Sequence, residues 1–253
     1  MRIIRLITIT VLFSFLITSC GITQSRVKKE READGYYQMG RAYLNENNLQ
    51  MAYVEFQKAI ESNPNDKLYY YAIGYIYVGL GKLQDAANAY KKAIKIDPKY
   101  GEAYNSLGAV YGKMERWDEA IAEYKKALNF PEYETPQLAH YNLGYAYYNK
   151  GDYKTSISEF KEAVRLQPDM AMSQLWLGNA YVKSGMTEDA IVSFEEAKKL
   201  DSTNVDVIYN LGLAYFKQGK RAEALDAFKK VIELSPKSEA AADSIKYIDL
   251  LKK

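Results

Sequence analysis

Histidine and cysteine, the side chains that most often serve as catalytic nucleophile, base or metal ligand, occur once each in this chain, as His140 and Cys20. A Cys/His catalytic site or a zinc site needs several such groups close together, which two residues cannot supply. Acidic residues such as Glu119 and Glu123 have helical spacing with lysines nearby, which is typical of solvated helix faces. We therefore expect no catalytic residue, no metal site and no enzyme. An enzyme or enzyme subunit stays the distant alternative, and it would depend on His140.

Cys20 ends an N-terminal stretch that differs from the rest of the chain. Arg2 and Arg5 give a positive start, and residues 6–17 form an almost unbroken apolar run. The run is short for a membrane span, so its pattern favours a signal peptide. Residues 17–20, Ile-Thr-Ser-Cys, resemble the lipobox of bacterial lipoproteins. That resemblance implies a signal peptide over residues 1–19 and a covalent lipid, palmitate included, on Cys20. An ordinary signal or anchor with an incidental cysteine is the alternative.

The residues after Cys20 bear on localisation and on charge. Gly21 rather than Asp follows the cysteine. By resemblance to Gram-negative lipoproteins, this implies a protein of the cell envelope that is anchored in the outer membrane and faces the periplasm. If the cell is of another type, the inner membrane is the alternative. Residues 20–32 are polar and predict a lipidated N-terminus with a flexible tether. Cleavage of the signal peptide removes Arg2 and Arg5, so the mature chain has equal numbers of basic and acidic residues. A chain without net positive charge is a poor partner for the phosphates of nucleic acid.

A sequence repeat determines the helices that we expect after residue 32. A Gly-x-x-Tyr pair recurs six times, with glycine spacings of 34, 34, 36, 34 and 34 residues, which is the mark of an array. The pairs are Gly40/Tyr43, Gly74/Tyr77, Gly108/Tyr111, Gly144/Tyr147, Gly178/Tyr181 and Gly212/Tyr215.

A second set of positions lies twelve residues behind the glycines. It holds a small residue followed four residues later by an aromatic one, so both lie on one helical face. The small residues are Ala52, Ala86, Ala120, Ser156, Ala190 and Ala224, and the aromatics are Phe56, Tyr90, Tyr124, Phe160, Phe194 and Phe228. Small residues at matched places on consecutive helices predict close antiparallel helix pairs. Pro64, Pro98, Pro168 and Pro236 fall just past four of the six predicted second helices, where a helix ends. Thr135 and Pro136 predict a capped start for the fourth repeat.

Leu-Gly-x-x-Tyr, then Ala-x-x-x-Phe/Tyr, then a small residue and proline, at a period of 34 residues, resembles the tetratricopeptide repeat (TPR) over residues 33–237. This resemblance implies an all-α TPR solenoid of six helix-turn-helix repeats in a right-handed superhelix. The predicted repeats are residues 33–66, 67–100, 101–136, 137–170, 171–204 and 205–236. Residues 237–253 should form a C-terminal capping helix, with Ile245, Ile248 and Leu251 on its apolar stripe.

In this family the binding groove is lined by first-helix positions three before and one after the glycine, and a further turn along. Carried onto this chain, the positions predict a groove rich in tyrosine, a residue that offers large apolar area and a hydroxyl. The predicted groove residues are Tyr37, Arg41, Tyr71, Tyr75, Asn105, Tyr141, Tyr145, Tyr148, Asn179 and Tyr209. The alternative for each tyrosine is packing between neighbouring repeats. His140 occupies a position where the repeat needs a buried residue.

The resemblance implies a protein-binding scaffold with a protein or peptide partner, no small-molecule substrate and no cofactor apart from the lipid. Six repeats behind a lipobox resemble the type IV pilus biogenesis and stability lipoproteins, the pilotins, which implies a secretin or pilus component as partner. The alternative is an adaptor for another envelope client: a cell-wall hydrolase, an outer-membrane assembly factor or a polysaccharide export system.

Overall fold

The computed structural model describes the backbone of residues 2–252 and the side chains of residues 24–252. The described residues form helices joined by short turns, with no strand among them. The chain divides into two compact units, Met1–Ala103 and Tyr104–Lys253, and the boundary falls inside one helix.

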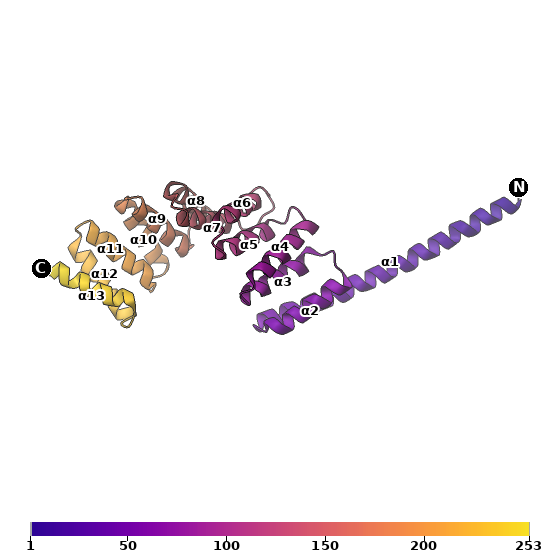
Figure 1. The fold of residues 1–253 in the computed structure, drawn as a ribbon, viewed down its shortest axis with the longest axis horizontal. Helices are drawn as coiled ribbons and strands as arrows, with labels where there is room; N and C mark the ends of the chain where they lie inside the picture. The colour runs from indigo at the N-terminus through magenta and orange to yellow at the C-terminus, as the bar shows by residue number, and fades with distance from the viewer. Residues whose placement is uncertain (1, 253) are drawn as a thin grey trace. The chain divides into compact units, whose positions relative to one another are not determined.

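The first unit contains α1 (Arg2–Asn45), α2 (Leu49–Ser62), α3 (Lys67–Gly79), α4 (Leu83–Ile96) and the start of α5 (Gly101–Lys113). The second unit contains the rest of α5, then α6 (Trp117–Leu128), α7 (Pro136–Asn149), α8 (Tyr153–Leu166), α9 (Ala171–Lys183), α10 (Thr187–Leu200), α11 (Val205–Lys217), α12 (Arg221–Leu234) and α13 (Glu239–Lys252). Successive helices pair, and each predicted repeat holds one pair (Figure 1).

The glycine positions explain why each pair packs so closely. A Cβ built on Gly178 would lie 2.4 Å from Cε1 of Phe194, and one on Gly40 would lie 2.5 Å from Cε1 of Phe56. The aromatic ring of the second helix therefore rests directly on the glycine of the first. The small residue twelve positions on also reaches that glycine: Ser156 donates a hydrogen bond to the carbonyl oxygen of Gly144 at 2.8 Å. Both sets of repeated positions thus meet at one helix crossing.

A third set of positions, which the sequence patterns did not single out, ends each first helix. Four glycines there have left-handed backbone, Gly81, Gly151, Gly185 and Gly219, with φ between +71° and +78°. Asn47 and Glu115 take the same place in the other two repeats, with φ of 56° and 59°. The turn is closed by a hydrogen bond from the next backbone N–H to a carbonyl five residues back, as from Arg116 to Tyr111 at 2.9 Å.

Two expectations differ from the structure at helix starts. The first helix begins at Arg2 rather than near residue 33, so residues 24–32, predicted as a flexible tether, are helical in α1. They are mostly exposed, and pairs four residues apart, such as Arg26 with Glu30 at 2.9 Å, support the helix. Thr135 occupies the N-cap position of α7, but its side chain makes no capping hydrogen bond.

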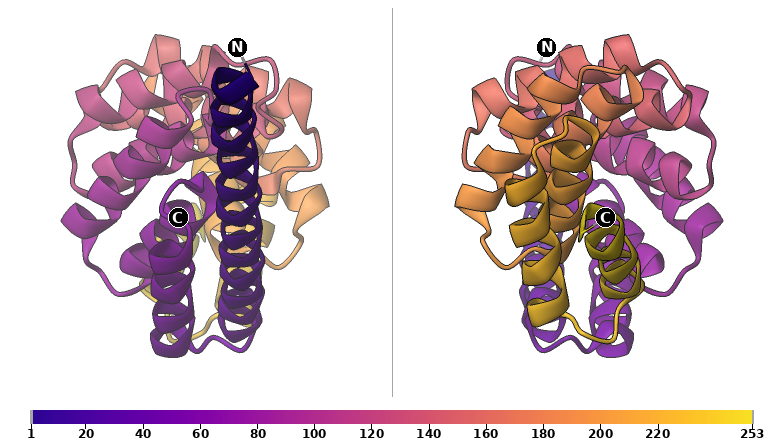
Figure 2. Two further views of the ribbon diagram at one scale, coloured as in Figure 1. Left: turned by 90° about the vertical axis from the view of Figure 1, so that its right-hand side faces the viewer. Right: turned by 90° about the vertical axis from the view of Figure 1, so that its left-hand side faces the viewer.

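The C-terminal helix α13 packs against α12, and Figures 1 and 2 show it in yellow beside the last repeat. Ile248 and Leu251 are buried as predicted, but Ile245 is 51% exposed. The buried face instead continues through Ala241 and Ser244, which follow the spacing of three, four and three residues that a helix of 3.6 residues per turn requires. The helix covers the ring of Phe228, on which Tyr247 stacks.

Candidate functional site

A groove of about 580 Å³ in the second unit is lined by four helices, three of which contribute aromatic side chains. We call it the aromatic groove. Its described lining residues are Ala109, Gly112, Lys113, Glu115, Trp117, Tyr124, Tyr141, Asn142, Tyr145, Asn149, Met172 and Trp176. They come from α5 and the turn after it, from the start of α6, from α7 and from α9, so that first helices of three successive repeats supply most of the wall.

Tyr145 is the centre of the aromatic groove. Its ring meets that of Trp176 edge to face, with centroids 4.7 Å apart and planes at 86°. It also meets the ring of Trp117 edge to face, with centroids 6.1 Å apart and planes at 71°. Edge-to-face contacts of this kind hold each ring against its neighbour. The groove therefore presents a row of rings whose positions are set before any partner arrives.

Two further tyrosines support this row. Tyr148 packs edge to face on Trp176 at 5.2 Å and on Tyr153 at 5.5 Å. Tyr141 lies on the buried ring of Phe160 at 5.8 Å. Burial raises the pKa of both Tyr141 and Tyr148 above the usual value for tyrosine, because the low dielectric disfavours a phenolate. Their hydroxyls are therefore neutral hydrogen-bonding groups.

Asparagine side chains supply the polar part of the lining. Asn142 donates a hydrogen bond from Nδ2 to Oδ1 of Asn105 at 3.0 Å, which fixes the Asn142 carboxamide between α5 and α7. Asn149 donates from Nδ2 to the backbone oxygen of Tyr145 at 2.8 Å. Charge enters only through Lys113 and Glu115 among the described lining residues, and these have opposite signs.

Some of the groove residues predicted in the second unit lie in or beside the aromatic groove, and others lie away from it. Tyr141 and Tyr145 line it, Tyr148 supports its wall, and Asn105 holds Asn142. Asn179 is half-buried outside the lining, and Tyr209 packs on Phe228 near the C-terminal helix. Leu175, in the position three before the glycine, is buried in the core.

The four predicted residues of the first unit form no such groove among the described residues. Tyr37 packs on Phe56 and Tyr69, with the guanidinium of Arg41 5.9 Å from its ring. Tyr71 packs on Tyr90 and Tyr100. Packing between neighbouring helices, the alternative reading, thus describes Tyr37 and Tyr71. Tyr75 is 59% exposed.

The groove residues that the sequence patterns missed include Trp117, Trp176 and Met172, and also Asn142 and Asn149. The signal was present, because the chain has only two tryptophans and both lie here. Asn142 and Trp176 each lie two residues before the repeated glycine of their own repeat. The prediction used the position three before that glycine, so it did not select them. Trp117 is the first residue of α6, a second helix, so no first-helix register could include it.

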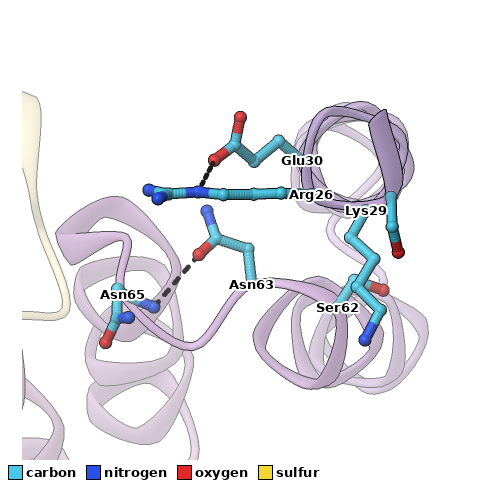
Figure 3. Close-up of a pocket in the computed structure, with 7 residues that line it drawn as sticks. Arg26, Lys29, Glu30, Ser62, Asn63 and Asn65 are labelled. Atoms are coloured by element: carbon cyan, nitrogen blue, oxygen red, sulfur yellow. Dashed lines mark hydrogen bonds and ion pairs between the residues drawn. The ribbon is translucent and has the colours of Figure 1, made fainter. Parts of the chain in front are cut away.

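A second depression, of about 620 Å³, lies between α1 and the turn after α2 and has a different character. Figure 3 shows Arg26 paired with Glu30, and the Asn63 carboxamide accepting the backbone N–H of Asn65 at 3.2 Å. Its described lining residues are polar or charged and include no aromatic anchor. It therefore lacks the aromatic side chains that line the aromatic groove.

His140 does not belong to the groove lining. It is half-buried, and its Nδ1 lies 2.8 Å from Oε2 of Glu159 on α8, so it links the two helices of the fourth repeat. Among the described residues, no cluster of three or more histidine, cysteine and acidic side chains is arranged to hold a metal ion. Cys20, the predicted lipidation site, lies outside the residues whose side chains are described. Within the described part, no helix has the length and apolar content to cross a membrane.

Sequence comparison identifies the repeats by their family models. Models described as "TPR repeat" match residues 74–115, 144–185 and 178–219. Models described as "Tetratricopeptide repeat" match residues 33–66, 55–87, 101–132 and 205–238. No curated protein sequence matches the chain.

Solved structures share the fold along most of the chain. PilW, described as a widely conserved type IV pilus biogenesis factor, is 21% identical, with 84% of this chain and 98% of that chain covered and a TM-score of 0.77. PilF of Pseudomonas aeruginosa is 19% identical, with 87% and 99% covered and a TM-score of 0.78. YrrB, described as a TPR protein with an unusual peptide-binding site, is 27% identical, with 76% and 97% covered and a TM-score of 0.63.

Proposed function

The chain belongs to the tetratricopeptide repeat family, a family of protein-interaction scaffolds, and we propose that it is a lipid-anchored scaffold of the cell envelope that holds a partner during assembly of a type IV pilus and its secretin. The repeats indicate a protein or peptide partner. Folds of this family are generally scaffolds rather than enzymes.

The observation that carries the binding role is the aromatic groove. Tryptophan and tyrosine dominate the energetics of protein interfaces, because each buries a large apolar area while few torsions are frozen. In this groove Trp117, Tyr145 and Trp176 are held by one another before binding, so little entropy is lost when a partner arrives. A partner segment can therefore use these rings as anchors.

Two observations support the envelope and the pilus. The N-terminal sequence has a positive start, an apolar run and the lipobox-like residues 17–20, which favour an exported and lipidated protein at the outer membrane facing the periplasm. PilW is described as a type IV pilus biogenesis factor, and 98% of the PilW chain aligns with this chain. The secretin or another pilus component is the client this combination favours.

Crosslinking in cells tests the proposal. In one variant a photoreactive amino acid replaces Tyr145, which lines the aromatic groove. In the matched control it replaces Val192, which is 60% exposed on α10 and does not line the groove. We expect capture of a secretin or pilus subunit from position 145 and not from position 192, and loss of assembled secretin when the gene is deleted. Capture of a cell-wall hydrolase, assembly factor or exporter from position 145 would keep the scaffold and reject the pilus. No specific capture there would reject the groove as the binding surface.

A further inference from the structure

Building on the scaffold function proposed above, we propose that the aromatic groove binds an uncharged, extended segment of the partner that contains proline and adopts the polyproline II conformation. The inference concerns only the chemistry of the occupant, and it rests on the aromatic lining, on the charge of that lining and on the polar groups beside the rings.

The aromatic lining suits an extended chain that carries proline. The ring of Tyr145 contacts those of Trp117 and Trp176, with centroids 6.1 and 4.7 Å apart and planes at 71° and 86°. The three rings therefore form one continuous aromatic surface, on which a pyrrolidine ring can pack. Grooves lined by aromatic residues are the general means of binding such segments, which lose little entropy because they are already extended.

The charge of the lining favours a neutral occupant. Of the described lining residues only Lys113 and Glu115 are charged; both belong to the α5–α6 turn region, and their charges offset each other. Trp117, Tyr141, Tyr145, Met172 and Trp176 along the rest of the groove carry no charge. A charged side chain of the partner would lose hydration against these rings without gaining an opposite charge, which is unfavourable. An uncharged segment avoids that loss.

The polar groups match a backbone that has no hydrogen bonds of its own. A polyproline II segment leaves its carbonyl oxygens to solvent or to a partner. Asn142 and Asn149 are each held in place by one hydrogen bond from Nδ2, to Asn105 and to the Tyr145 backbone. A carboxamide carries two N–H donors, so each asparagine has a second donor to offer a partner carbonyl. These two residues lie on α7 along with Tyr145, where they can bind the backbone while the rings bind the side chains.

Intrinsic fluorescence tests the inference directly, because both tryptophans of the chain line the groove. The probe is an acetylated and amidated peptide of three Pro-Pro-Ala units, titrated into the purified full-length protein. We expect a saturable shift of tryptophan emission to shorter wavelength. A peptide of equal length with every proline replaced by alanine should bind at least about tenfold more weakly. Equal binding of the two peptides, or no binding of the proline peptide, would overturn the inference.

Variants and a charged peptide locate the effect. Tyr145→Ser should weaken the proline peptide about tenfold with an unchanged circular dichroism spectrum, whereas Val192→Ser on the exposed face of α10 should leave its affinity unchanged. A peptide with lysine in place of each alanine should bind more weakly, and tighter binding of that peptide would make the groove a cation site and reject the inference. If the proline peptide fails to bind but position 145 still captures a specific partner in cells, this inference alone is rejected. If both experiments fail, the groove is also rejected as the binding surface.

Discussion

Gly178 lies directly beneath the ring of Phe194, so that a Cβ at position 178 would come within 2.4 Å of Cε1 in a ring that is completely buried. This contact recurs at each repeated glycine of the chain, and it fixes how closely the two helices of a repeat approach. The spacing of the first helices, from which most of the aromatic groove is built, depends on it.

Gly178→Ala should therefore lower stability, although alanine is the better helix former. The helix itself gains about 1 kcal/mol from the exchange, but overpacking a filled core costs about 1 to 3 kcal/mol, so a net loss is expected. Gly112→Ala is the matched control in the same unit, because its Cβ would meet Trp117 and Tyr124 at ordinary distances of 3.5 and 3.6 Å. Melting temperatures compare the two variants. A Gly178→Ala protein that melts at or above the wild-type temperature would show that the ring can move aside.

Much of the fold follows from the sequence because the repeat sets it locally. The glycine, the small residue, the aromatic and the proline each have a steric task within one helix pair, and six copies in one register define that pair. Ile245 was predicted wrongly for a different reason. Ile245 faces solvent because the apolar face of α13 runs through Ala241 and Ser244, small residues that a search for large apolar side chains passes over.

The site was predicted less completely than the fold. Family positions on first helices found Tyr141 and Tyr145, but the same rule also selected Tyr71, which packs on Tyr90 and Tyr100. A tyrosine at one register can face the groove or a neighbouring helix, depending on how large the side chains beside it are. Trp117 enters the groove from the start of a second helix, so it depends on the turn between helices, which the repeat pattern does not describe.

That turn leads to a prediction at Glu115, which has a left-handed backbone with φ of 59° where four other repeats have glycine. A non-glycine residue in this region is disfavoured by about 1 kcal/mol or more. Glu115→Gly should therefore raise stability by up to about 1 kcal/mol, since glycine also loses more entropy on folding. The reciprocal change Gly151→Glu, at φ of +78°, should lower stability. Denaturant midpoints measure both, and a loss of stability in Glu115→Gly would contradict the strain.

Alkaline stability should depend on the tyrosine pair Tyr53 and Tyr77, whose hydroxyl oxygens lie 3.1 Å apart. The hydrogen bond with Tyr53, together with burial, raises the pKa of Tyr77 to about 12 from its ordinary value of 10.0. A raised pKa in the folded state means that the neutral hydroxyl stabilises the fold below about pH 10, and this contribution is lost as the pH rises toward about 12. Denaturant unfolding at several pH values should show the loss. Tyr53→Phe should reduce it, whereas Tyr75→Phe, at a 59% exposed side chain, should not.

Membrane attachment tests the proposed anchor. If Cys20 carries the lipid, Cys20→Ser should either release the protein from the membrane fraction or leave residues 1–19 uncleaved, because serine offers no thiol for acylation. Fractionation of cells together with the mass of the mature N-terminus measures both outcomes. A second variant, Ser19→Ala, keeps the thiol and should be processed and attached normally. A cleaved serine variant that stays in the membrane fraction would reject the lipid anchor.

Tyr71 and Tyr145 occupy predicted groove positions in two different repeats, yet their surroundings in the structure differ. Tyr71 packs between the rings of Tyr90 and Tyr100 at 5.4 and 5.2 Å, so Tyr71→Ser should cost about 2 kcal/mol of stability, less than the full loss of a buried aromatic, and should leave peptide binding in the aromatic groove unchanged. Tyr145 faces the groove between the two tryptophans, so Tyr145→Ser should weaken peptide binding more than it lowers the melting temperature. Thermal melting and peptide titration on both variants give a two-by-two comparison. Equal losses of binding in the two variants would mean that folding of the whole array, rather than the rings of the groove, controls the affinity.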